Sequence, residues 1–302
     1  MQMFRGSFTA LVTPMKENGA IDFDAYKNLL RFQMNEGIDG LVPLGTSGET
    51  PTLDEDEEDK IIALVMSEVK QFEVEHEKKI TVILGAGSNN TRDAVRYTER
   101  AKNAGADAAL VVTPYYNKPS NEGLYRHFEA VSKVGIPIIV YNIQGRTGKN
   151  IDTETLCRIA ELPNIAGVKE ASGNINQMMD VIAKIKMKRT DFAVLCGDDA
   201  LTLALMAAGG DGVVSVVSNL FPKRIADFVN AMLVGDFENA RTMHYALLPF
   251  FKAAFVDGNP TSIKCAMAMK GLCENFVRLP LAPVSDDAKK IIEQAMKLVT
   301  RY

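Results

Sequence analysis

The chain has 302 residues, of which 47% are apolar and 24% charged, a composition typical of globular enzymes and binding proteins. A net charge of −4 without a block of Lys and Arg argues against nucleic acid as a partner, and no apolar stretch reaches the roughly 20 residues needed to span a bilayer. The N-terminus lacks a signal-peptide pattern, the four cysteines form no CxxC and the three histidines no ligand-spaced pair, so we expect a cytoplasmic chain with reduced thiols and without a metal.

Short apolar runs alternate with longer amphipathic segments, which predicts parallel strands joined by helices. Strands are expected at residues 7–13, 40–43, 80–84, 108–112, 138–141, 165–169, 192–196 and 212–216, with helices between them, for example at 24–36, 55–73, 91–104 and 201–208. Eight such units predict an α/β fold of the (β/α)8 TIM-barrel class. An open doubly wound sheet is the alternative, although Gly85-Ala86-Gly87 lacks the third glycine of a dinucleotide fingerprint.

The strand pattern stops near residue 221, and helices are expected at 221–234, 236–256, 262–272 and 286–299. Three of these exceed what eight strand–helix units need. We therefore predict a barrel domain at residues 1–225 and a C-terminal helical extension at 226–302 that packs on the barrel. The units are not similar enough in sequence to predict a repeat.

The most informative residue is Lys169, which ends the apolar run Ile165-Ala166-Gly167-Val168. Side chains alternate along a strand, so Lys169 shares a face with Ile165 and Gly167. Burial there lowers a lysine's pKa, and a neutral amine attacks carbonyls to form a Schiff base. The alternative is a lysine whose stem lies on apolar surface while its ammonium reaches water, which is commoner for a lone strand-end lysine.

A loop of hydroxyls and glycines, Gly45-Thr46-Ser47-Gly48, follows the second expected strand. Backbone N–H groups and hydroxyls in such a loop can bind a small carboxylate. A plain turn, with Thr50 or Asp54 capping the next helix, explains the same residues equally well.

Tyrosines and an arginine follow the fourth and fifth strands. Tyr115 and Tyr116 stand beside prolines, where phenols can relay protons or pack on the surface. Tyr141 shares a face with Ile139, so its hydroxyl points into a barrel and needs a partner. Arg146 lies between glycines and is a candidate fork for a carboxylate, although single loop arginines are more often solvated.

The seventh and eighth strands end in residues of weaker signal. Cys196 and Gly197 close the seventh strand, and Cys196 is best explained as a small buried hydrophobe. Asp198 and Asp199 suit the start of the following helix. Val214 is apolar and near the mouth of the expected barrel.

From about Gly6 to its C-terminal helices, the chain resembles the dihydrodipicolinate synthase / N-acetylneuraminate lyase family of pyruvate-dependent class I aldolases. The resemblance rests on Gly45-Thr46-Ser47-Gly48-Glu49, Thr113-Pro114-Tyr115-Tyr116-Asn117, Tyr141-Asn142, Arg146-Thr147-Gly148, Gly167-Val168-Lys169-Glu170 and Asn259-Pro260. The Tyr-Tyr-Asn loop and Arg146 are typical of the synthase branch. The resemblance implies a lyase that condenses pyruvate with L-aspartate 4-semialdehyde in lysine and diaminopimelate biosynthesis.

The resemblance also implies catalytic roles. Lys169 would form the Schiff base with pyruvate, and Tyr141 beside it would move protons. Thr46 would link Tyr141 to Tyr116, which in this family crosses from a neighbouring subunit of a dimer or a dimer of dimers. No cofactor and no metal are implied.

Substrate-binding roles follow from the same resemblance. Thr46 and Ser47 would hold the pyruvate carboxylate, and Arg146 the carboxylate of aspartate semialdehyde. Gly197 and Val214 match positions that line the pyruvate pocket.

Two positions depart from the family pattern and leave the second substrate open. Ser47 stands where a second threonine is usual, and Gln144 stands where many relatives have proline, which would loosen the loop of Arg146. The alternatives within the mechanism are sialate lyase, 2-keto-3-deoxy-sugar-acid aldolase and hydroxy-oxoglutarate aldolase. Outside it, the chain would be a catalytically silent barrel that binds a keto acid.

Feedback by lysine, the end product of the pathway that this family feeds, is expected to be weak or absent. Glu55 and Glu58 occupy positions where lysine-sensitive relatives commonly carry histidines. A carboxylate at Glu55 would repel the carboxylate of the effector, whereas a histidine could donate a hydrogen bond to it. Initial rates measured over a lysine titration check this prediction, and inhibition at micromolar lysine would contradict it.

Overall fold

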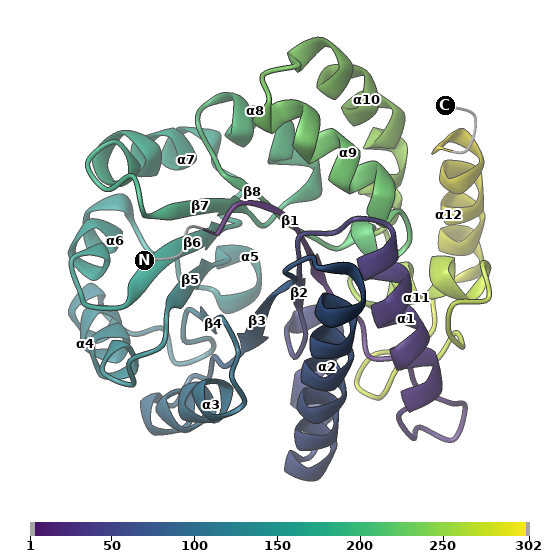
Figure 1. The fold of residues 1–302 in the computed structure, drawn as a ribbon, viewed down its shortest axis with the longest axis horizontal. Helices are drawn as coiled ribbons and strands as arrows, with labels where there is room; N and C mark the ends of the chain where they lie inside the picture. Colours follow the sequence, from purple (N-terminus) through teal and green to yellow (C-terminus); the bar gives the residue numbers. More distant parts are fainter. Residues whose placement is uncertain (1–3, 300–302) are drawn as a thin grey trace. The chain divides into compact units, whose positions relative to one another are not determined.

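The computed structural model describes residues 4–299 and contains eight parallel strands closed into a barrel in the order β1 to β8 (Figure 1). The strands are β1 (Gly6–Ala10), β2 (Gly40–Val42), β3 (Thr81–Gly85), β4 (Ala108–Val112), β5 (Ile138–Asn142), β6 (Ile165–Glu170), β7 (Ala193–Cys196) and β8 (Gly212–Ser215). The predicted TIM barrel is confirmed, and the open doubly wound sheet is excluded. The first strand ends three residues before the predicted bound of 13.

Helices separate the strands as the periodicity predicts. They are α1 (Phe23–Asn35), α2 (Glu55–His76), α3 (Thr91–Asn103), α4 (Asn121–Ser132), α5 (Gln144–Thr147), α6 (Thr153–Ala160), α7 (Ile175–Val181) and α8 (Thr202–Ala207). The C-terminal segment follows with α9 (Pro222–Leu233), α10 (Phe237–Ala253), α11 (Thr261–Ala268) and α12 (Asp286–Val299). This helical segment is confirmed, while the boundary at residue 225 stays a prediction. None of the helices in residues 4–299 combines the length and the apolar character that a membrane crossing requires.

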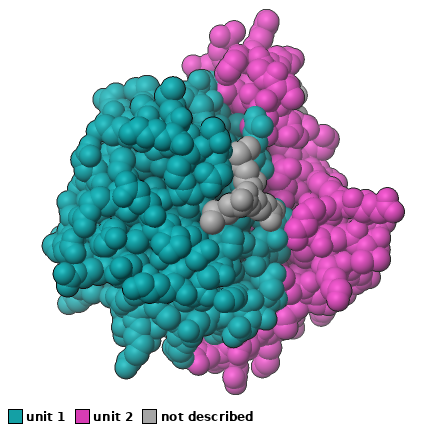
Figure 2. Space-filling model, turned by 60° about the vertical axis from the view of Figure 1, so that its left-hand side comes forward, with its two compact units in different colours: residues 1–6, 81–214 teal, residues 7–80, 215–302 magenta. Residues whose placement is uncertain are grey.

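Two compact units divide the chain, and Figure 2 colours them separately. Unit 1 contains Thr81–Val214 and the N-terminal residues up to Gly6, and unit 2 contains Ser7–Ile80 and the chain from Ser215 onward. In unit 1, strands β3 to β7 pair in register, and α3, α4, α6 and α7 pack each on the next. In unit 2, α10 packs on α9 and α12.

A buried ion pair fixes the loop after β2 in unit 2. Lys264 on α11 donates to Glu49 Oε1 at 2.7 Å and to the Thr13 carbonyl at 2.9 Å, and both charged side chains are fully buried. The second oxygen of Glu49 accepts from the backbone N–H of Arg278 at 2.9 Å. Because every charged atom has a partner, this buried lysine is structural.

A recurring aspartate joins strands at their amino-terminal ends. Asp39, Asp107 and Asp211 each follow a Gly-x pair and immediately precede β2, β4 and β8. Each carboxylate accepts from a backbone N–H of the preceding strand at 2.8 Å, from Ser7, Val82 and Val194 respectively. Each aspartate's own N–H donates back to the carbonyl of that residue at 2.8–2.9 Å. The structure therefore contains a local repeat that we did not predict.

Replacing Asp107 by alanine tests the contribution of this reciprocal pair. The change leaves the N–H of the buried Val82 without its acceptor, which should lower the free energy of unfolding by about 1–3 kcal/mol. Urea denaturation measures the change. Asp107→Asn keeps an acceptor oxygen and should cost less, and an unchanged midpoint for Asp107→Ala would contradict the assignment.

Candidate active site

Lys169 and Tyr141 are direct neighbours on adjacent strands. In the register of β5 and β6, Tyr141 pairs with Lys169, and paired residues of parallel strands present their side chains on the same face. The Lys169 Nζ atom lies 4.2 Å from the centre of the Tyr141 ring. Both residues are buried, and Lys169 is only 5% exposed. Strand alternation alone therefore brings an amine and a phenol together in a water-poor position.

Burial changes the acid–base properties of Lys169. Desolvation lowers the pKa of its amine from 10.5 to about 8, because removal from water disfavours the ammonium. The carboxylate of Asp199 raises this pKa, and the guanidinium of Arg146 lowers it further. At pH 7, about one tenth of the amine is neutral, against fewer than about one in a thousand for an unshifted lysine. The site therefore holds a nucleophilic amine near neutral pH.

Glycine at position 197 provides the space that the Lys169 side chain occupies. A Cβ atom placed on Gly197 would lie 3.0 Å from Cε and 3.1 Å from Cγ of Lys169, and 2.7 Å from Ala171. The strand register extends this face from β6 to β7 and β8, because Lys169 pairs with Leu195 and Leu195 with Gly212. Val214, two residues after Gly212, therefore lies on the same face as Lys169.

Arg146 lies in the short helix α5, directly after β5, and its side chain is exposed. Its charge acts on the Lys169 amine, so unit 1 brings Lys169, Tyr141, Gly197 and Arg146 into one neighbourhood.

Tyr116 is placed differently, because its side chain is 89% exposed. Its φ of +72° is rare for a bulky residue. The Asn117 N–H donates to the Tyr115 carbonyl at 2.8 Å, so Tyr116 occupies the centre of a tight three-residue turn. Within one chain, the structure does not bring Tyr116 onto Lys169.

Thr46 and Ser47 lie in unit 2, in the 3-10 turn Thr46–Gly48. Ser47 is buried, and its Oγ accepts from Asn259 Nδ2 at 3.0 Å, whereas Thr46 is exposed. The helix that follows is capped by Asp54, whose carboxylate accepts from the Glu57 N–H at 2.8 Å. The turn and the expected Asp54 cap are therefore both present, as separate features.

The carboxyl end of β7 contains a residue whose electrostatic role was not predicted. Asp198 caps the next turn by accepting from the Ala200 N–H at 2.9 Å, as expected. Asp199 lies in that turn, but its carboxylate is buried and acts on Lys169. Burial raises the pKa of the Cys196 thiol to about 12, which confirms an unreactive buried hydrophobe there.

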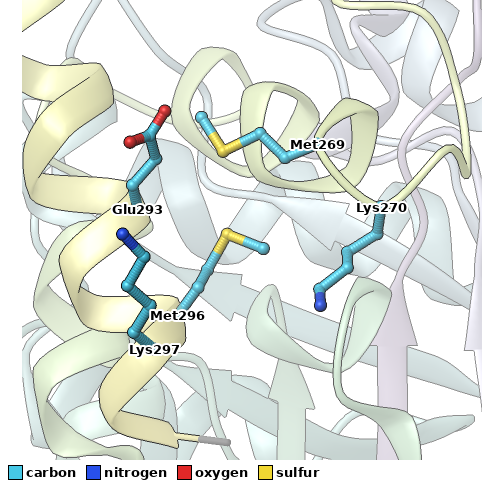
Figure 3. Close-up of a pocket in the computed structure, with 5 residues that line it drawn as sticks. All are labelled: Met269, Lys270, Glu293, Met296 and Lys297. Atoms are coloured by element: carbon cyan, nitrogen blue, oxygen red, sulfur yellow. The ribbon is translucent and has the colours of Figure 1, made fainter.

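A surface pocket of about 240 Å³ is unrelated to these residues. It lies in unit 2 and is lined by Met269, Lys270, Glu293, Met296 and Lys297, from the end of α11 and from α12 (Figure 3). It contains none of the predicted site residues. Within residues 4–299, no group of three or more His, Cys, Asp or Glu side chains is placed to hold a metal ion.

Comparisons with known proteins identify the family of the chain. The model of the dihydrodipicolinate synthetase family matches residues 3–299. The chain belongs to this family. A 4-hydroxy-tetrahydrodipicolinate synthase of Protochlamydia amoebophila is 47% identical over 97% of this chain and 95% of its own length. The predicted family and the predicted class of enzyme, a lyase, are confirmed.

Solved structures of the family share the fold. Dihydrodipicolinate synthase of Thermotoga maritima is 42% identical, with a TM-score of 0.94 and complete coverage of both chains. The synthase of Acinetobacter baumannii, crystallised with pyruvate, is 35% identical, with a TM-score of 0.92 over 98% of this chain and 99% of its own.

Replacing Tyr141 by phenylalanine tests the phenol in this pair. The ring beside Lys169 stays, so the fold and the burial should be kept, while the hydroxyl is lost. Turnover should fall about 10²–10⁴-fold, the contribution of a positioned acid or base. Steady-state kinetics beside circular dichroism measures both. Near-normal turnover of a folded variant would remove Tyr141 from the mechanism.

Proposed function

We propose that this chain condenses pyruvate with L-aspartate 4-semialdehyde through a Schiff base on Lys169, the activity of a 4-hydroxy-tetrahydrodipicolinate synthase acting in the cytoplasm. The observation that carries the proposal is the buried amine of Lys169 over the Tyr141 ring, with its pKa lowered to about 8. The name shared by relatives at 43–47% identity supports the same activity.

The reaction begins with the neutral amine of Lys169 attacking the ketone carbon of pyruvate. Loss of water gives an imine, and loss of a proton from the methyl group gives an enamine. The enamine carbon adds to the aldehyde of aspartate semialdehyde. The amino group of that substrate then attacks C2, which closes the ring and releases the lysine amine.

Tyr141 is the group that moves protons at these steps. A phenol beside the reacting nitrogen can give a proton to the departing oxygen and accept one from the methyl carbon. The 4.2 Å separation between Lys169 Nζ and the centre of the Tyr141 ring supports this role.

Two loops would hold the substrate carboxylates. Thr46 and Ser47 follow β2. Ser47 Oγ accepts from Asn259 Nδ2 at 3.0 Å and donates to Asn259 Oδ1 at 3.3 Å, so in our proposal its O–H exchanges this longer bond for one to the pyruvate carboxylate. Arg146 follows β5 and offers a fork for the carboxylate of the semialdehyde. Gly197 and Val214 line the pocket, Gly197 by the space that it leaves beside Lys169.

Self-association completes the proposal, as a dimer or a dimer of dimers. Tyr116 is an exposed aromatic residue held at an unfavourable φ, a cost that is typical of functional positions. In our proposal, Tyr116 joins Thr46 and Tyr141 across a subunit contact. Sedimentation measures the assembly.

Borohydride trapping tests the proposed function. Pyruvate with borohydride should add one reduced pyruvyl group, found on Lys169 by peptide mass spectrometry, and Lys169→Ala should abolish it. Because only the neutral amine reacts, the initial trapping rate should rise about tenfold per pH unit below pH 8 and level off above it.

Lys264 provides the matched control, because it is also buried but its amine donates hydrogen bonds to Glu49 and to the Thr13 carbonyl. Label on Lys264, or label that survives in Lys169→Ala, would contradict the proposal. A panel of aldehydes then separates the synthase from the sialate, sugar-acid and hydroxy-oxoglutarate aldolases. Binding of pyruvate without any label after borohydride treatment would instead indicate the catalytically silent barrel that only binds a keto acid.

A further inference from the structure

The same two strands that present Lys169 and Tyr141 carry a second buried pair on their other face. Asn142 and Glu170, the next residue in each strand, are paired in register and fully buried. The Glu170 Oε1 atom accepts from the Ser172 N–H at 2.7 Å. Its Oε2 accepts from Asn142 Nδ2 at 3.1 Å and from Gln177 Nε2 at 3.5 Å. Amide donors therefore surround the carboxylate.

Asn142 also closes the loop that carries Arg146. Its Oδ1 accepts from the Ile151 N–H at 3.0 Å, and its Nδ2 donates to Asn150 Oδ1 at 2.9 Å. The chain thus leaves β5 at Asn142, passes through Arg146 in α5, and returns to the side chain from which it started. One buried amide holds both ends of the loop.

Gln177, on α7, holds the returning end from the other side. Its Nε2 donates to the Ile151 carbonyl at 3.1 Å, and its Oε1 accepts from Asn150 Nδ2 at 2.8 Å. The backbone N–H of Ile151 can only donate and its carbonyl can only accept, so the orientations of all three amides are determined. Two of them, Asn142 and Gln177, turn N–H groups toward Glu170 Oε2.

We propose that Glu170, Asn142, Asn150 and Gln177 form a loop clamp that positions Arg146 and so sets the affinity for the second, carboxylate-bearing substrate. The four are positioning residues, because they act through Arg146. The inference rests on the proposed function of Arg146. A guanidinium fork binds a carboxylate well only when its base is held in place, and residues 144–146 are exposed.

Gln177→Met is the most direct variant, since it keeps the length of the side chain and removes its donor and acceptor. The KM for aspartate semialdehyde should rise between about tenfold and a hundredfold. The KM for pyruvate and the borohydride label on Lys169 should not change. Asn176→Ala, the exposed neighbour on the same helix, is the matched control and should behave as the wild type. Asn150→Ala removes the contacts that the Asn150 side chain makes with Asn142 and Gln177, and it tests the clamp if Gln177→Met does not fold.

A double-mutant cycle with Arg146→Ala separates positioning from general damage. Once Arg146 is absent, Gln177→Met should raise the KM for aspartate semialdehyde no further. Additive effects of Gln177→Met and Arg146→Ala on the KM for aspartate semialdehyde would overturn the inference. So would an unchanged KM in both Gln177→Met and Asn150→Ala, or a loss of pyruvate labelling as large as the loss of semialdehyde use.

Hydrogen exchange tests the clamp without any substrate. The N–H groups of Arg146, Thr147 and Gly148 donate within α5, and they should exchange faster in Gln177→Met than in the wild type or Asn176→Ala. Unchanged exchange would contradict the clamp. A wild type that shows the label but does not turn over the semialdehyde would contradict the proposed function and the substrate half of this inference, and exchange would still decide the loop half.

Discussion

The desolvation of one ammonium group is the constraint on which the rest of the site depends. Lys169 is the last but one residue of β6, a strand whose every residue is buried, and its charged form loses its water there. Around it are the groups that make this position usable: the Tyr141 ring at 4.2 Å, the open side of Gly197, and the opposing charges of Asp199 and Arg146. Desolvation is the largest of these effects, so the amine is partly neutral near pH 7.

Burial of the Lys169 charge also lowers the free energy of unfolding. This cost is fully present below pH 8, where the folded state must bury a charge. It is relieved as the pH rises toward 10.5, because the unfolded state then binds more protons than the folded one.

The two faces of the β5–β6 strand pair carry residues with different roles. The inward residues of β5 and β6, Tyr141 and Lys169, form the pair that we propose reacts, and the outward residues, Asn142 and Glu170, contact the loop that follows β5. A shift of register by one residue would exchange the two faces. The other buried lysine shows the contrast, because Lys264 has a carboxylate and a carbonyl as partners and contributes to the structure alone. We infer that the partners of its nitrogen decide whether a buried lysine can act as a nucleophile, as we propose for Lys169, or only stabilises the fold, as Lys264 does.

The sequence predicted the parts of this arrangement that follow from strand alternation and chain order. The eight strands, the inward parity of Lys169 and Tyr141, and the C-terminal helices needed only periodicity, and the family needed only the motifs at the strand ends. It did not predict contacts that depend on how helices pack. The Glu49–Lys264 pair joins residues 215 positions apart, and the Gln177 contacts depend on the angle of α7. The Gly-x-Asp repeat was missed because its three copies share only two residue types. The backbone of Tyr116 was beyond prediction as well, since a positive φ at a tyrosine runs against its conformational preference.

The central claim, that burial supplies a neutral amine, is tested most directly by the titration of Lys169 itself. Heteronuclear NMR of the ¹⁵N-labelled lysine side chains, with Lys169→Met to assign the resonance, follows the amine as the pH is raised. We expect a midpoint at about pH 8, well below the ordinary lysine value of 10.5. A midpoint near 10.5, the ordinary value for an exposed lysine, would contradict the account.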